Sequence, residues 1–228
     1  MTRPHTTLFL LESLDGKIST GESNDRDLDK DMPSIKGVFE GRKQYDDLEQ
    51  ETDLCSLNTG KVMAKIGWNE VKESIEKIPV SFVIVDNKPH LTELGISNLL
   101  KRTKKLYIVT TNAAHPAKHL DDPSLEVCYF DDEVNFEELF KQLYAKGEER
   151  ITLQSGGELN AVLLRAGMID EVSIVIAPML VGGRDTPTLI DGESLVTRED
   201  LSKIRPLKLR EAKTLNNSYL HLSYDVVN

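Results

Sequence analysis

Cysteine and long hydrophobic runs are both scarce in this chain of 228 residues. Its two cysteines, Cys55 and Cys128, lie far apart and form no Cys-x-x-Cys pattern. They therefore indicate neither a disulfide framework nor a cysteine-type zinc site, and free thiols are typical of the reducing cytosol. The first apolar run, Leu8 to Leu11, is too short for a signal sequence or a membrane span, so we expect a cytoplasmic protein.

Basic residues are outnumbered by acidic ones. The chain has 28 lysines and arginines against 38 aspartates and glutamates, a formal net charge of -10. A general nucleic-acid binder needs clustered positive charge, so that class is excluded, although a local basic patch can still bind a small phosphorylated molecule. We expect no metal site either, because the pair His115 and His119 is interrupted by Pro116 and has no further ligand close by.

Three widespread catalytic motifs are missing. The sequence has no Gly-x-Ser-x-Gly nucleophile elbow, no P-loop lysine after a glycine-rich turn, and no Gly-x-Gly-x-x-Gly dinucleotide fingerprint. These absences argue against an α/β-hydrolase, a P-loop enzyme and a Rossmann fold.

Short apolar runs, several of them rich in β-branched residues, alternate with helical patterns along the chain. This order predicts one α/β domain over residues 1–228, with a mostly parallel central sheet flanked by helices. The last run alternates polar and apolar residues, which predicts an antiparallel hairpin closing the sheet at an edge. The predicted strands are Thr6–Leu11, Ser81–Val85, Leu106–Thr110, Glu126–Phe130, Arg150–Leu153, Val172–Ala177 and Tyr219–Val226. The predicted helices cover about Lys61–Ala64, Gly95–Lys101, Asn135–Lys146 and Leu159–Ala166.

A glycine pair stands between a predicted strand and a predicted helix, in Gln154-Ser155-Gly156-Gly157-Glu158-Leu159-Asn160. Glycine lets the backbone approach a ligand closely. The N–H groups of the first helical turn then point at an anion, and the helix dipole favours negative charge there. This loop therefore predicts a phosphate-binding site.

Polar residues follow several predicted strands at their carboxyl ends, where ligands bind in open α/β sheets. Ser13, Asp15 and Lys17 follow the first strand, and their types suit sugar hydroxyls and phosphate, although Asp15-Gly16 is equally a turn signal. Asp86-Asn87 and Thr110 end two further strands, where they either meet a cofactor ribose or close a turn. Residues 21–50 are highly charged and poor in aliphatics, which is typical of a loop over a site or of a solvated surface excursion.

Two sets of residues together resemble one enzyme family. They are Arg3-Pro4 with Ser13-Leu14-Asp15-Gly16-Lys17, and the series Gly156-Gly157, Leu159-Asn160, Asp170-Glu171, Pro178 and Gly182-Gly183. They resemble the reductase domain of riboflavin biosynthesis, the C-terminal half of the bifunctional deaminase-reductase. The resemblance implies a dihydrofolate-reductase-like fold, a homodimer and NADPH as cofactor. It also implies the reaction, in which the ribosylamino group of 5-amino-6-(5-phosphoribosylamino)uracil becomes a ribitylamino group.

The resemblance also implies roles for individual residues. Asp15 lies beside the site, Ser23 touches the substrate, and Asn87 lies near NADPH. The cofactor-binding set is Leu11, Asn87, Thr110, Gly156, Gly157, Glu158, Leu159 and Asn160. From residue types and positions together with the resemblance, we predict that the substrate is bound by Ser13, Lys17, Ser23, Lys61, Lys65 and Gln154.

The chain departs from the family pattern at several of its polar positions. Gln154 stands where the family has glutamate, Phe9 where it has lysine, and residues 61–67 where it has Thr-x-x-x-Asp-x-Pro. A polar pocket discriminates strongly through such groups. Two alternatives therefore stay open beside the riboflavin reductase: a paralogous NADPH-dependent reductase of another carbonyl, imine or pteridine-like compound, and a nucleotide-binding module without catalysis.

The predicted hydride transfer needs a proton donor as well as a cofactor. Asp15 and Glu12 are the two candidates, and a carboxyl group can serve if burial raises its pKa. Lys17, Lys61 and Lys65 are candidates for binding a substrate phosphate or the 2′-phosphate of the cofactor.

Overall fold

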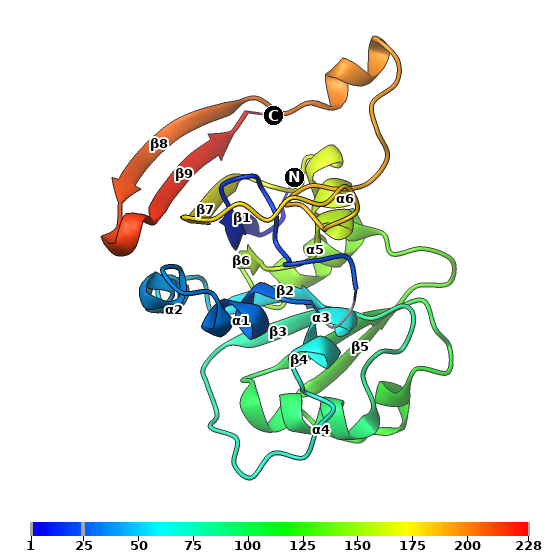
Figure 1. Ribbon diagram of the computed structural model, residues 1–228. Coiled ribbons are helices and arrows are strands. Elements are labelled where there is room, and N and C mark those ends of the chain that lie inside the picture. The colour runs from blue at the N-terminus through cyan, green and yellow to red at the C-terminus, as the bar shows by residue number, and fades with distance from the viewer. Residues whose placement is uncertain (1, 24–25, 228) are drawn as a thin grey trace. The chain divides into compact units, whose positions relative to one another are not determined.

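The computed structural model describes residues 2–23 and 26–227, and its contacts divide the chain into two compact units. Among the described residues, the first unit contains 2–5 and 53–155, and the second contains 6–23, 26–52 and 156–227. The single reductase domain expected over residues 1–228 stays a prediction. Figure 1 labels the strands and α-helices of both units.

The first unit is built on parallel strands in the order β5-β4-β3-β2-β6. Every residue of β4 is buried, as expected for a strand with neighbours on both sides and helices over its faces. The strands are β2 (Cys55–Thr59), β3 (Ser81–Val85), β4 (Leu106–Thr110), β5 (Leu125–Tyr129) and β6 (Arg150–Leu153). The helices are α3 (Gly60–Lys65), α4 (Glu93–Arg102), the short 3-10 helix η3 (Pro116–His119) and α5 (Phe136–Ala145).

Side-chain caps begin the two longer helices of this unit. The Thr92 hydroxyl accepts a hydrogen bond from the Gly95 N–H at 3.2 Å, and the Asn135 side chain accepts one from Glu138 at 3.0 Å. Each cap satisfies a backbone donor that has no partner within its helix. The second of these helices buries one apolar face, since Leu139, Phe140 and Leu143 are fully buried.

The second unit combines a parallel strand pair with an antiparallel hairpin, in the order β1-β7-β9-β8. The strands are β1 (His5–Ser13), β7 (Glu171–Ala177), β8 (Leu207–Thr214) and β9 (Leu220–Val226). The helices are α1 (Leu28–Asp31), η1 (Met32–Ser34), η2 (Phe39–Gly41), α2 (Lys43–Glu49), α6 (Gly157–Arg165), η4 (Glu199–Lys203) and η5 (Asn216–Ser218).

The C-terminal hairpin is confirmed, but its last strand does not lie at the edge (Figure 1). β9 pairs with both β7 and β8, so the edge strand is β8, for which no separate strand was predicted. All eight residues of β8 are exposed, so its positions do not alternate between buried and exposed in the structure. Such alternation is the signal by which a half-buried strand is recognised.

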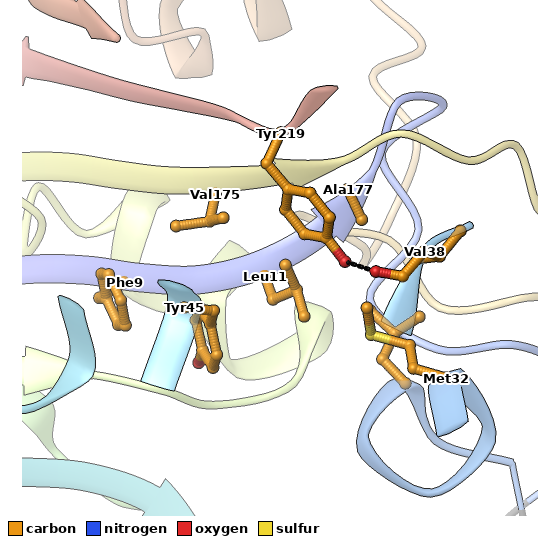
Figure 2. Close-up of a cluster of buried hydrophobic side chains, with 9 residues drawn as sticks. Phe9, Leu11, Met32, Val38, Tyr45, Val175, Ala177 and Tyr219 are labelled. Carbon is orange, nitrogen blue, oxygen red and sulfur yellow. Dashed lines mark hydrogen bonds between the residues drawn. The ribbon is translucent and has the colours of Figure 1, made fainter. Parts of the chain in front are cut away.

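The charged segment before β2 is anchored in the core of the second unit and is not a solvated excursion. Four of its sparse apolar residues, Leu28, Met32, Val38 and Tyr45, are buried, whereas Phe39 is 45% exposed. The ring of Tyr45 stacks on Phe9 of β1, with 5.1 Å between the ring centroids (Figure 2). Because these residues are far apart in a charged sequence, no periodic pattern predicted their burial.

Tyr219 joins this segment to the hairpin. Its hydroxyl donates a hydrogen bond to the Val38 carbonyl at 2.7 Å (Figure 2). Its ring lies over Gly41, where a Cβ atom would be 2.4 Å from the ring. Tyr219→Phe leaves the buried Val38 carbonyl without this donor, so we expect the free energy of unfolding to fall by about 1 kcal/mol. Urea denaturation measures it, with Tyr224→Phe, on the strand that begins just after Tyr219, as the control. Equal stability of the two variants would contradict the prediction.

Candidate functional site

The turn after β1 is held by its own side chains. The Ser13 hydroxyl donates to Asp15 Oδ1 at 2.5 Å and accepts a hydrogen bond from the Lys17 N–H at 2.9 Å. Gly16 has φ +74°, a conformation that favours glycine. The turn interpretation of Asp15-Gly16 is therefore confirmed, and the same turn places the predicted polar cluster at the carboxyl end of β1.

Asp15 ties this turn to the loop that follows β7. Its carboxylate accepts hydrogen bonds from the N–H groups of Val181 at 3.0 Å and Gly182 at 2.7 Å. The Ser13 hydroxyl, together with these two backbone donors, lowers the pKa of Asp15 to about 2. The carboxylate is therefore ionised at neutral pH, and its oxygens are engaged in holding the loop.

Asp15→Asn is expected to loosen that loop. An asparagine turns one acceptor oxygen into a donor that faces a backbone N–H, so we expect faster amide hydrogen exchange at Val181 and Gly182. In the wild type, the hydrogen bonds should persist as pH falls below the ordinary value of 3.8 and weaken only as the pH approaches about 2. The exposed neighbour Asp185 provides the control, Asp185→Asn, and equal exchange in both variants would refute this role.

Lys17 is buried, although it carries an ammonium group. It is 9% exposed, and its Nζ atom donates to the Thr186 carbonyl at 2.8 Å. Backbone hydrogen bonds run beside it, from Leu189 N–H to the Gly16 carbonyl and from Ile18 N–H to the Pro187 carbonyl. The segment of residues 186–191 is thereby fixed along the turn after β1.

The same segment packs against the start of α6. The Asp191 N–H donates to the Gly157 carbonyl, and the Asn160 side chain donates to the Leu189 carbonyl at 2.9 Å. A Cβ atom on Gly157 would lie 2.3 Å from the Thr188 carbonyl oxygen and 2.4 Å from Asp191 Oδ2. Residues 186–191 thus connect the two motifs of this unit that the sequence singled out. Sequence reasoning missed this segment, although its Asp191-Gly192 pair is a turn signal.

The two glycines of the loop serve different purposes. Gly157 is required by close packing, whereas a Cβ atom on Gly156 would meet nothing within 4 Å. Gly156 is also the N-cap of α6 and provides no side-chain cap to the first-turn N–H groups. Open space in front of such a helix start suits a phosphate group. Glu158 is exposed in that first turn, and Leu159 is half-buried.

Glu12 differs sharply from Asp15. Its Oε2 atom is buried and, within residues 2–23 and 26–227, has no hydrogen-bond partner. Burial raises its pKa from 4.5 to about 7. The neighbouring Leu11 points into the hydrophobic cluster of this unit, and Ser23 is exposed in the loop that follows the turn.

Asp86 organises the corresponding strand end in the first unit. Its buried carboxylate accepts hydrogen bonds from the N–H groups of His90 and Leu91 and lies 3.1 Å from His115 Nε2. Although burial by itself raises the pKa of Asp86, the hydrogen bonds from His115 and the backbone outweigh it and lower the pKa. A Cβ atom on Gly60, the first residue of α3, would lie 2.2 Å from Asp86 Cγ.

His115 is a partner of Asp86 and is fully buried. Its Nδ1 atom accepts a hydrogen bond from the Ala117 N–H at 3.1 Å, so the proton lies on Nε2 and is donated to Asp86. His119 is exposed. Among the residues that the structure describes, no group of three or more histidine, cysteine, aspartate or glutamate side chains is placed to hold a metal ion.

The remaining predicted residues of the first unit lie at strand ends and on α3. Asn87 is exposed, and its side-chain oxygen accepts from the Thr111 N–H, whereas the buried Thr110 hydroxyl donates to the Asp86 carbonyl. The Ser56 hydroxyl donates to Gln154 at 2.8 Å. Lys61 is exposed and Lys65 half-buried, four residues apart on α3.

Comparison with known proteins decides the family. Residues 4–220 match the family described as the RibD C-terminal domain. The chain belongs to this family. The predicted resemblance is thereby confirmed over nearly the whole chain, as is the prediction of a riboflavin-pathway reductase fold.

Two relatives of this protein are named as reductases. The 2,5-diamino-6-ribosylamino-4(3H)-pyrimidinone 5′-phosphate reductase of Methanothermobacter thermautotrophicus is 28% identical, with 96% of each chain covered. The protein of that name from Aquifex aeolicus is 25% identical, with 100% of this chain and 99% of the relative covered. This protein is thus a member of a family of reductases.

A solved structure supports the fold. Acinetobacter baumannii RibD matches with a TM-score of 0.68 and 15% sequence identity. All of this chain is covered, and it spans 59% of that protein. The prediction of an α/β fold with a mostly parallel sheet is confirmed. Within the described part of the RibD family chain, no helix has both the length and the apolar character needed to cross a membrane.

Proposed function

We propose that this chain is an NADPH-dependent reductase that converts the ribosylamino group of 2,5-diamino-6-ribosylamino-4(3H)-pyrimidinone 5′-phosphate into a ribitylamino group. The observation that carries the proposal is the agreement in name between relatives matched over 96–100% of this chain. The uracil compound suggested by sequence resemblance differs only in carrying a carbonyl in place of one amino group. Because the two compounds differ at only this ring position, activity should be measured with both.

The nicotinamide cofactor would supply hydride to the sugar carbon C1′. The start of α6 fits its diphosphate, since Gly156 leaves open space there and offers no side-chain cap. Gly157, Glu158, Leu159 and Asn160 would complete this cradle. Asn87 and Thr110 remain proposed cofactor contacts at strand ends, and Leu11 a contact through its backbone.

Cationic and polar groups would bind the substrate. Lys61 and Lys65 lie on α3 and would bind phosphate, either that of the substrate or the 2′-phosphate that distinguishes NADPH from NADH. Ser13, Lys17, Ser23 and Gln154 are the proposed contacts to the sugar and the pyrimidine.

A paralogous substrate is the second candidate, and Phe9 is the observation that favours it. Phe9 stands where the family pattern has a lysine, and here its ring is 2% exposed and stacked on Tyr45. A lysine at this position would be a cation in an apolar cluster, so whatever contact the family lysine makes is absent from this chain. A reductase of another carbonyl, imine or pteridine-like compound would accommodate that loss.

Loss of NADPH absorbance with each of the two pyrimidine phosphates tests the proposal, together with binding titrations of NADPH and NADH. Faster turnover of the diamino compound with NADPH is the expected result. Tight NADPH binding without turnover of either compound would favour the paralogous reductase or a module without catalysis. A homodimer stays a prediction, and the exposed edge strand β8 offers it a surface.

A further inference from the structure

Two carboxyl groups flank Ser13, and the structure gives them opposite properties. Asp15 is held by three hydrogen bonds from Ser13, Val181 and Gly182. Glu12 has a buried oxygen that no described residue contacts by a hydrogen bond. A carboxyl group that accepts several hydrogen bonds is stabilised as the anion, whereas one removed from water without such bonds keeps its proton.

The side chain of Glu12 lies on the face of β1 opposite to the apolar cluster. Phe9 and Leu11 belong to the cluster that also contains Tyr45 and Tyr219. Because successive side chains of a strand point to opposite faces, Glu12 projects away from that cluster. It is paired in register with Ile176 and is the penultimate residue of β1. Glu12 therefore lies at the carboxyl end of a parallel strand, where ligands bind in α/β sheets.

The charged side chains of the adjoining turn, Asp15 and Lys17, form hydrogen bonds with other parts of the protein. The Asp15 carboxylate binds the loop after β7, and the Lys17 ammonium donates to the Thr186 carbonyl. Burial is the cause of the raised pKa of Glu12, and no ion pair is formed by it within the described residues. Glu12 can therefore act as an acid near neutral pH, and Asp15 serves as a positioning residue.

We propose that Glu12 is the proton donor of the reductase, an inference that rests on the proposed function. As the C1′–O4′ bond of the ribosylamino group breaks, its electron pair goes to O4′, which takes the proton of Glu12. The lone pair of the exocyclic nitrogen forms a double bond to C1′, and hydride from NADPH then adds to that carbon. One proton and one hydride are consumed, NADP⁺ is formed, and water returns the proton to Glu12.

Glu12→Gln tests the role, because the amide has nearly the same shape but cannot donate a proton in this way. We expect kcat to fall about 10²- to 10⁴-fold, with KM and the NADPH dissociation constant little changed. Wild-type kcat should fall as pH rises through about 7, where the acid loses its proton, and the variant should lack that decline. Asp47→Asn, on the exposed surface of α2, is the matched control and should behave as wild type.

A second readout does not depend on turnover. The ¹³C NMR titration of glutamate carboxyl groups, compared between wild type and Glu12→Gln, assigns the midpoint of Glu12 directly. A midpoint near 7 supports the inference, and one near the ordinary 4.5 overturns it. Wild-type rates in Glu12→Gln would also overturn it. If the wild type reduces neither pyrimidine, the proposed function fails, and the titration alone then decides whether Glu12 remains an acid suited to another substrate.

Discussion

Gly157→Ala is expected to lower the free energy of unfolding by about 3 kcal/mol and to weaken binding of NADPH at the proposed site by about tenfold. The added Cβ atom would lie 2.3 Å from the Thr188 carbonyl oxygen, which belongs to the backbone and cannot rotate away. Overpacking of this kind shifts the backbone, at a penalty of about 1–3 kcal/mol or more. The shift would displace the first turn of α6, and misplacement by about 1 Å is enough to impair a preorganised site.

Gly156→Ala separates packing from ligand contact. The two glycines are adjacent, but a Cβ atom on Gly156 meets no protein atom, and its backbone at φ -74° suits alanine. We therefore expect wild-type stability from Gly156→Ala, measured by urea denaturation, and weaker NADPH binding only if the diphosphate lies against this residue. Equal stability losses in both variants would show that packing against residues 186–191 is not what requires glycine.

Asp86→Ala is expected to destabilise the first unit by about 3–4 kcal/mol. It removes the acceptor for the N–H groups of His90 and Leu91 and for His115 Nε2, all of which are then left without this partner. Each buried donor without a partner costs about 1–3 kcal/mol, less where water enters. Urea denaturation measures the loss, and hydrogen exchange should rise over residues 87–92.

The contribution of Asp86 to the free energy of unfolding should depend on pH. Because the pKa of Asp86 is lowered on folding, its contribution is present above the ordinary value of 3.8 and is lost as pH falls further. The difference in free energy of unfolding between wild type and Asp86→Ala should therefore become smaller as the pH falls below 3.8. The control is Asp132→Ala, which removes an exposed carboxylate of the same unit. If this difference in free energy of unfolding did not change with pH, a stabilising role for the ionised carboxylate would be contradicted.

The strands that the sequence predicted correctly are those that form continuous, largely apolar runs. β3, β4 and β6 were located to the residue, since runs such as Leu106–Thr110 are rich in β-branched and aromatic side chains. β2 was missed because Ser56 and Asn58 interrupt its pattern. Both are 8% exposed in the structure, and β2 is buried because it pairs with β3 and β6 on its two sides.

Local chemistry also indicated the positions of the candidate site, but not the roles within it. The glycine loop and the Asp15-Gly16 turn were found from sequence because turns and helix starts depend on neighbouring residues. The segment 186–191 was missed because its contacts with Gly16 and Gly157 join residues far apart in the chain.

The sequence by itself determined most of the strands and helices, the family resemblance and the glycine pair at the start of α6. Only the tertiary structure decided between the two carboxyl groups beside Ser13. Glu12 and Asp15 carry the same functional group three residues apart, so no local pattern separates their acidities. Folding brings the N–H groups of Val181 and Gly182 to Asp15, and it buries the Oε2 atom of Glu12 without giving that atom a partner among the described residues. The pKa of a carboxyl group depends on those surroundings, which the fold alone assembles.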